Sequence, residues 1–182
     1  MIKNYLDNVV KQFEYYKSIG DKALDQLSEK ELFWRYNKES NSIAIIIKHL
    51  HGNMLSRWTN FLNSDGEKNN RDRDDEFEVT IKSKKDIVQD WNQGWQTLFD
   101  ALAVLNENNF KQTVHIRNQK HSITEAINRQ MMHYAYHIGQ MVYVGKMIKG
   151  KAWKNLSIPI GRSKAYNEEI RAKLNHDELK PN

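Results

Sequence analysis

Two histidines four residues apart, His133 and His137, have the residue type and spacing of a metal site. Residues four apart on an α-helix lie on one face, with their Cβ atoms about 5–6 Å apart, so both imidazoles can reach one ion about 2.1 Å from each nitrogen. The chain of 182 residues has no cysteine, which excludes disulfides, thiolate zinc sites and a cysteine nucleophile. A metal ion would therefore be bound by histidine or carboxylate side chains.

This spacing alone leaves two interpretations open. Seven histidines in 182 residues produce such a pair by chance in roughly one sequence in four. At about 100° per residue, His137 falls within an apolar stripe that runs from Ile123 to Met141, and His133 flanks it, so both imidazoles need a polar partner. A metal ion would supply that partner, and so would a network of hydrogen bonds within the core. A third ligand would decide between them.

The candidates for a third ligand lie in two places. His49 and His51 belong to one predicted helix, and His115 and His121 precede another, whereas His176 sits in a polar tail and is set aside. His49 and His51 lie on opposite flanks of the apolar stripe of their helix, so at most one of them can join a common site. Periodicity alone does not choose between them.

The elements that would position these histidines are helical, because the chain has two prolines and its apolar residues are spaced by three and four. We therefore predict an all-α fold. The long helices are expected from about Ile2 to Gly20 or a little beyond, from Asn41 or Ser42 to near Leu62, from about Ser83 to Asn106, and from Ser122 to about Gly150. Capping boxes at Ser28–Glu31 and Ser122–Glu125 are expected to begin a short helix and the fourth long helix, respectively.

A connection of roughly twenty residues, 63–82, separates the second and third long helices and has no helical periodicity. Its residues 71–74 alternate arginine and aspartate, and we expect them to pair with one another on the surface, although a loop this long can also border a site. Residues 111–121 are expected to form either a short hairpin or an irregular loop.

Several other side chains have both a packing and a functional interpretation. The tryptophans, at positions 34, 58, 91, 95 and 153, are expected in the core, the alternative being a pocket over the metal. Arg57 is expected to pair with an acid of the long connection, or else to hold a substrate carboxylate. Gln130 and Tyr134 are expected to pack, the alternative being support of the ligands.

Composition limits the class of protein. The net charge is +5, but basic and acidic residues are interleaved, which argues against a nucleic-acid partner. No apolar run approaches the length of about 20 residues that spans a membrane, and the N-terminus lacks the pattern of a signal peptide, so we expect no membrane partner and a cytoplasmic location. Residues 1–182 are expected to form one domain that ends in a short helix and a tail of about ten residues.

The segments KHLHGNMLSRW and RQMMHYAYHIGQMVYVGK resemble the DinB-like superfamily of damage-inducible metalloproteins. The resemblance covers most of the chain and implies a four-helix bundle that forms a homodimer. It also implies three histidine ligands, one from the second helix and an H-x-x-x-H pair from the fourth. In this sequence they are His49, the histidine that precedes Leu50, together with His133 and His137.

The function implied by the resemblance is thiol chemistry. Characterised members of the superfamily are similar to bacillithiol, mycothiol or glutathione S-transferases and to a thiol-dependent isomerase. In this sequence, the segment SRWTNFLNSDGEKNNRDRDDEF resembles an uncharacterised branch of the superfamily. Three imidazoles leave one metal position open, as in catalytic sites. We therefore expect a divalent ion, zinc or nickel, and a metal-dependent S-transferase acting on a low-molecular-weight thiol and an electrophile. The alternatives are a metal-dependent hydrolase at the same site and a non-catalytic metal-binding or interaction protein.

Overall fold

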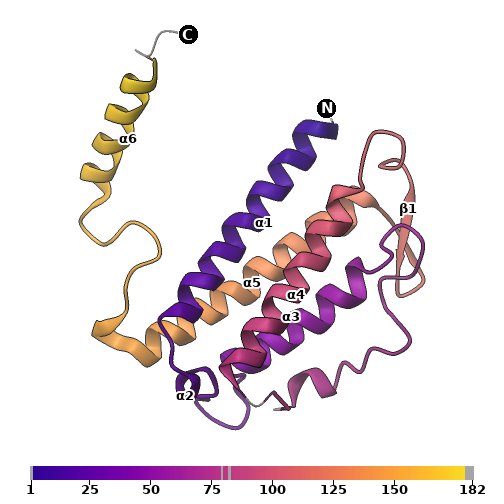
Figure 1. Cartoon of the computed structure of the whole chain (residues 1–182), viewed down its shortest axis with the longest axis horizontal. Helices are drawn as coiled ribbons and strands as arrows, with labels where there is room; N and C mark the ends of the chain where they lie inside the picture. The colour runs from indigo at the N-terminus through magenta and orange to yellow at the C-terminus, as the bar shows by residue number, and fades with distance from the viewer. Residues whose placement is uncertain (1, 79, 82, 179–182) are drawn as a thin grey trace.

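Most of the chain is helical. The computed structural model describes residues 2–78, 80–81 and 83–178, and helices account for 64% of the chain (Figure 1). A small two-stranded sheet is the departure from the predicted all-α fold, which is otherwise broadly confirmed. The helices are α1 (Ile2–Asp25), α2 (Glu29–Leu32), α3 (Ile43–Trp58), α4 (Lys84–Ala103), α5 (Ile123–Lys149) and α6 (Ser163–Glu178), with short 3-10 helices η1 (Asp75–Phe77) and η2 (Gly150–Ala152).

The long helices α1, α3, α4 and α5 lie side by side and share one core (Figure 1). Phe13 of α1 packs with its ring 6.4 Å from Trp58, 6.1 Å from Trp95 and 6.0 Å from Tyr134, so side chains of all four helices meet there. The indole Nε1 of Trp58 donates a hydrogen bond of 2.9 Å to the hydroxyl oxygen of Tyr134. This buried bond fixes α3 relative to α5, the two helices that carry the predicted ligands.

Three of the five tryptophans are buried in this core, as packing predicts, and none of the five lines the cavity that His49, His133 and His137 share. The three buried tryptophans are Trp58, Trp91 and Trp95. Trp34 is exposed and Trp153 is half-buried, packing close to Gly145 of α5. The alternative of a tryptophan-lined pocket over the histidines is therefore wrong.

The predicted start of α5 is confirmed. The hydroxyl oxygen of Ser122 accepts a hydrogen bond of 3.2 Å from the backbone N–H of Glu125, whose carboxylate accepts one of 2.7 Å from the N–H of Ser122. The same reciprocal pattern at Ser28 and Glu31 begins α2. Gly150, with a φ of 52°, ends α5 in the left-handed region that favours glycine.

The first helix continues further past Gly20 than the sequence predicts. Helix α1 continues to Asp25, and Gly20 is buried because the indole of Trp91 on α4 lies against it. A Cβ atom at position 20 would lie 2.4 Å from Cζ2 of Trp91. The glycine thus serves close packing of α1 on α4, and Trp91 completes the contact by donating a hydrogen bond of 2.6 Å to Asp21.

The two middle helices end earlier than predicted. Helix α3 ends at Trp58 rather than near Leu62, and α4 ends at Ala103 rather than near Asn106. After α3, Asn60 adopts a φ of 51°, which is incompatible with a continuing right-handed helix.

Residues 111–121 contain a hairpin, which decides between the two predicted alternatives. Strands β1 (Thr113–Ile116) and β2 (Gln119–Ser122) pair antiparallel and lead directly into α5. The connecting residues Arg117 and Asn118 have φ values of 54° and 61°, the combination of a two-residue type I′ turn.

The predicted C-terminal helix is present, and it is longer than expected. Helix α6 stands apart from the other helices in Figure 1, and its side chains Tyr166 and Ile170 are exposed. It includes residues 173–178, which sequence assigned to the tail; the last residues of that tail, 179–182, lie outside the described part of the chain.

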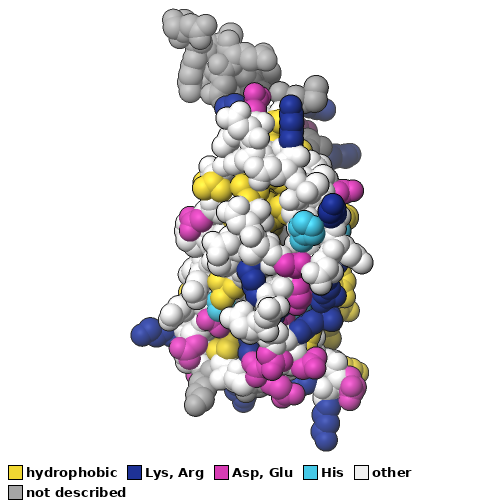
Figure 2. All heavy atoms as spheres, turned by 90° about the vertical axis from the view of Figure 1, so that its right-hand side faces the viewer, with side chains coloured by type: hydrophobic (Ala, Val, Ile, Leu, Met, Phe, Trp, Pro, Cys, Tyr) yellow, Lys and Arg dark blue, Asp and Glu magenta, His cyan; other side chains and the backbone are white. Residues whose placement is uncertain are grey.

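The surface carries intermixed charges. On the face shown in Figure 2, basic and acidic side chains lie among one another, and no single-sign stripe crosses it. Among the described residues, no helix is both long enough and apolar enough to cross a membrane.

Candidate metal centre

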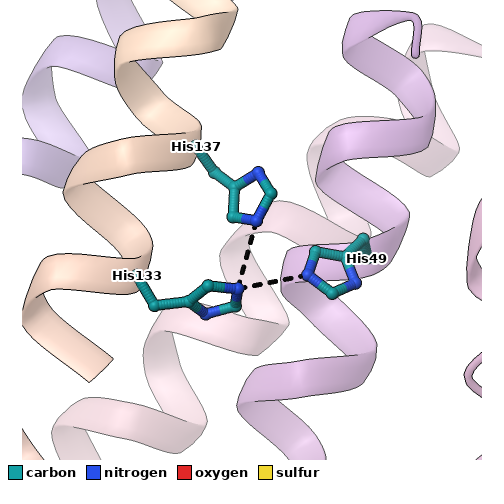
Figure 3. Close-up of side chains that lie close together, drawn as sticks. All are labelled: His49, His133 and His137. Carbon is teal, nitrogen blue, oxygen red and sulfur yellow. Dashed lines mark hydrogen bonds between the residues drawn. The ribbon is translucent and has the colours of Figure 1, made fainter. Parts of the chain in front are cut away.

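The three histidines singled out as ligands lie together between α3 and α5 (Figure 3). Nε2 of His133 lies 3.3 Å from Nε2 of His49 and 3.1 Å from Nε2 of His137. One ligand nitrogen from each residue lies within 4.8 Å of the others, and the group could hold a metal ion. Metal binding itself stays a prediction.

The separations between these nitrogens suit one ion bound by all three. Two ligands about 2.1 Å from a tetrahedral ion lie roughly 3.4 Å apart, close to the observed 3.1 and 3.3 Å. Hydrogen bonds alone do not satisfy this arrangement, because the one proton that Nε2 of His133 can carry serves only one neighbour. A cation at the centre would satisfy all three nitrogens.

The outer nitrogens of two ligands have partners that set the proton position. Nδ1 of His49 lies 2.9 Å from a carboxylate oxygen of Glu76, and Nδ1 of His137 lies 2.8 Å from the amide oxygen of Gln140. Because both partners are acceptors, each Nδ1 carries the proton and each Nε2 presents its lone pair toward His133. This is the tautomer that binds metal through Nε2.

Glu76 is held in place by a buried arginine. Arg71 donates to its two carboxylate oxygens at 2.7 and 2.9 Å, and both side chains are about 5% exposed. Burial alone would raise the pKa of Glu76, but its hydrogen bonds to His49 and Arg71 outweigh this effect and hold the pKa below its ordinary value. Glu76 is therefore ionised at neutral pH and can orient the His49 ring.

The pairing expected within residues 71–74 is wrong. Arg71 instead binds the carboxylates of Glu67 and Glu76, because folding of the long connection brings these acids to its buried guanidinium. Arg57 pairs with Glu67 at 3.0 Å, which confirms the prediction that it pairs with an acid of the long connection. The loop thus borders the histidine cluster through Arg71 and Glu76, while its residues 72–75 are exposed.

The same loop is tied to the hairpin. The carboxylate of Asp65 accepts hydrogen bonds from the backbone N–H groups of Arg117 and Asn118, at 2.9 and 2.7 Å. The N–H of Gly66 donates to the carbonyl oxygen of His115 at 2.8 Å. These bonds anchor the loop at one end, and η1 at its other end presents Glu76 to α3.

Gly52 makes room for Glu76. It lies inside α3, where glycine costs about 1 kcal/mol relative to alanine. A Cβ atom at position 52 would lie 2.4 Å from a carboxylate oxygen of Glu76 and 2.9 Å from its Cδ. The glycine therefore allows the carboxylate to approach the helix closely enough to reach His49.

The family model described as a protein of unknown function, DUF1572, matches residues 1–162. The chain belongs to the DUF1572 family. No curated protein matches it. The matched region contains all three histidines, the loop that carries Glu76 and the hairpin, whereas α6 begins after it.

In this DUF1572 protein three other histidines, His51, His115 and His121, lie outside the cluster. His51 points to α4, where its Nε2 lies 3.2 Å from the amide oxygen of Gln93, so it is His49 that faces α5. His115 and His121 belong to the strands of the hairpin, outside the histidine cluster.

Tyr134 and Gln130 differ in their surroundings. The hydroxyl of Tyr134 is buried and donates to the amide oxygen of Asn53 at 3.1 Å, so this residue serves core packing, as expected. Gln130 is buried too, but it lines a cavity beside the histidines, and its amide oxygen has no hydrogen-bond partner among the described residues.

Two of the clustered histidines are held neutral. Burial, reinforced by repulsion from His137 and His49, lowers the pKa of His133 to about 3. Burial and the neighbouring His49 lower the pKa of His137 to about 4. Both imidazoles are therefore uncharged and able to bind metal well below neutral pH.

These shifts predict that the chelator-stripped DUF1572 protein loses stability as the pH falls below about 6.5. In the unfolded chain His133 and His137 take up protons near pH 6.5, whereas in the folded protein these two residues do not until near pH 4. The free energy of unfolding should fall by up to about 1.4 kcal/mol per pH unit for each histidine in this window. Urea unfolding between pH 7 and 5 measures the slope, and an unchanged slope in a His133→Gln, His137→Gln double variant would contradict the prediction.

Proposed function

We propose that this protein is a metal-dependent S-transferase that binds a divalent ion, zinc or nickel, through His49, His133 and His137. The convergence of three imidazole nitrogens, two of them from rings whose outer nitrogen lies beside an acceptor oxygen, is the observation that carries the proposal. We also propose that α1, α3, α4 and α5 form the four-helix bundle of the DinB-like superfamily.

The histidine cluster borders an open cavity. All three histidines line one cavity of about 340 Å³, which leaves room for a substrate at a fourth metal position. A divalent ion held there would lower the pKa of a bound thiol, so that the thiol would release its proton to solvent and its sulfur would react as a thiolate. Because the chain has no cysteine, the thiol is a substrate. Its sulfur forms a bond to an electrophilic carbon, and the leaving group departs with the bonding electron pair.

The lining of this cavity favours S-transfer over hydrolysis. A metal-dependent hydrolase uses a base, commonly a carboxylate, to take a proton from water. No aspartate or glutamate lines the cavity in the described part of the chain, and Glu67 and Glu76 are occupied by arginines. A metal-bound thiol needs no such base, because the ordinary pKa of a thiol, about 8.5, is already far below that of water.

The resemblance further implies a homodimer, and we propose one. Four exposed apolar side chains follow one face of α5 and offer a surface for a second copy: Met132, Tyr136, Tyr143 and Met147. Light scattering of the full chain tests it, since a mass of 21.6 kDa would correspond to the monomer.

The proposed function is tested on untagged protein. We expect about one zinc or nickel ion per chain by elemental analysis, and thioether formation from glutathione, cysteine or bacillithiol and an aromatic halide. A chelator should abolish turnover, and added zinc or nickel should restore it. Turnover that needs no thiol would instead identify a hydrolase, and bound metal without turnover with any of these thiols would identify a non-catalytic metal protein.

A further inference from the structure

The cavity beside the histidine cluster is lined by an unusual number of arginines. They come from α3, the long loop, the hairpin turn and α5, segments far apart in the sequence: Arg57, Arg71, Arg73, Arg117 and Arg129. Fixed guanidinium groups bind carboxylate and phosphate oxygens in a bidentate geometry. Their convergence on one cavity indicates a site for a negatively charged group.

The protein's own carboxylates do not balance these charges. Glu67 pairs with Arg57, Arg71 and Arg117, and Glu76 pairs again with Arg71. In the described part of the chain, Arg73 and Arg129 form no ion pair. Five guanidinium groups thus meet two carboxylates. The cavity keeps an excess of positive charge in partly buried surroundings, where an anion is attracted more strongly than in water.

Two buried polar side chains of the cavity are also left without full hydrogen bonding. Arg57 and Gln130 are 5% and 3% exposed, and neither Nε of Arg57 nor Oε1 of Gln130 has a partner among the described residues. Buried polar atoms are normally hydrogen-bonded, so these two side chains keep hydrogen-bonding capacity that the described residues do not use. One of the two unpartnered atoms donates and the other accepts.

Arg129 places part of this positive charge next to the metal ligands. Arg129 precedes His133 by one turn of α5, so a group bound to its guanidinium lies close to the cluster. Phe77, whose ring stacks on His49 at 5.0 Å, and Tyr136 add apolar surface for a carbon skeleton. A cavity of about 340 Å³ is at the small end of those that bind low-molecular-weight ligands.

We propose that this cavity binds a small anionic substrate, whose carboxylate or phosphate group is held by Arg129, Arg73 and Arg57 while its reacting end faces His49, His133 and His137. The substrate role rests on the proposed function. The binding of the anion does not, because the arginines and the unpartnered polar atoms belong to the protein itself.

Calorimetry with two simple anions tests the proposal. Inorganic phosphate and succinate are titrated separately, at low salt, into full-length protein that is either zinc-loaded and freed of unbound zinc, or stripped by a chelator. We expect at least one of the two anions to bind both forms of the protein. The anion that binds more tightly indicates whether the charged group of the substrate is a phosphate or a carboxylate. Arg129→Gln and Arg73→Gln, changes at exposed side chains that form no ion pair, should each weaken binding roughly 10- to 100-fold.

The matched control is Arg171→Gln, which removes the same charge from the exposed surface of α6 and should leave the Kd unchanged. Three results would overturn the proposal. The first is equal weakening of anion binding in Arg171→Gln, and the second is anion binding to the zinc-loaded form alone with no effect of Arg129→Gln. The third is no binding of either anion. If anion binding is found but thiol-dependent turnover is not, the S-transferase assignment fails while the anion site stands.

Discussion

His133→Ala is expected to abolish stoichiometric metal binding and to leave the fold intact. The variant removes the ligand nitrogen that lies between those of His49 and His137, at 3.3 and 3.1 Å. Loss of an outer-shell partner typically costs about 10- to 100-fold in affinity, so loss of a ligand should cost at least about 100-fold. The fold should persist because Nδ1 of His133 has no hydrogen-bond partner among the described residues. Elemental analysis and competition with a chromophoric chelator measure the loss, and circular dichroism checks the fold.

His51→Ala is the control for this experiment. His51 lies on the same helix as His49 but contacts Gln93 of α4, so its removal should leave the metal content unchanged. Retention of one ion per chain in both His133→Ala and His137→Ala would contradict the assignment of the ligands.

The orientation of His133 and His137 could be predicted from local sequence. A capping box at Ser122 sets the start of α5, and the apolar residues that follow at spacings of three and four fix which face turns inward. These signals depend only on neighbours within a few residues along the chain. For that reason the start of the helix and the two ligands on its inner face were both predictable.

The third ligand could not be chosen by periodicity, and the structure shows why. Helix α3 is buried around most of its circumference: twelve of its sixteen residues are buried, including the run Ile43–Ile47. A helix surrounded in this way also buries residues on both sides of its apolar stripe, so His49 and His51 on the two flanks look alike in sequence. The resemblance to a family pattern, rather than the pattern of apolar residues, singled out His49.

Glu76 was missed for a different reason. Five acids lie between residues 72 and 78, and only the folding of the loop over α3 selects one of them to contact His49. That folding depends on contacts distant in sequence, such as those of Asp65 with the hairpin turn. The one local signal was Gly52, a glycine inside a helix, whose cost implies a close approach by another part of the chain.

Glu76→Ala is expected to destabilise the protein and to weaken metal binding together. It leaves the buried guanidinium of Arg71 without its bidentate partner, and breaking a buried ion pair in this way costs about 3–5 kcal/mol. It also removes the acceptor that orients His49, which should lower the metal affinity about 10- to 100-fold. Urea unfolding measures the first effect, and chelator competition on the folded variant measures the second.

Gly52→Ala tests whether Glu76 acts by orienting His49 or only by its negative charge. The added methyl group would lie 2.4 Å from a carboxylate oxygen of Glu76, so the carboxylate must shift away from His49 although every charged group is retained. We expect weaker metal binding in this variant and little further loss when Glu76→Ala is added, because both changes disrupt the same contact. Gly139→Ala is the matched control: it also replaces a helix-interior glycine, but nothing lies within 4 Å of its Cβ position, so its metal affinity should equal that of the wild type. Should Gly52→Ala bind metal as tightly as Gly139→Ala, the carboxylate does not orient His49, and the loop stabilises the fold without tuning the metal site.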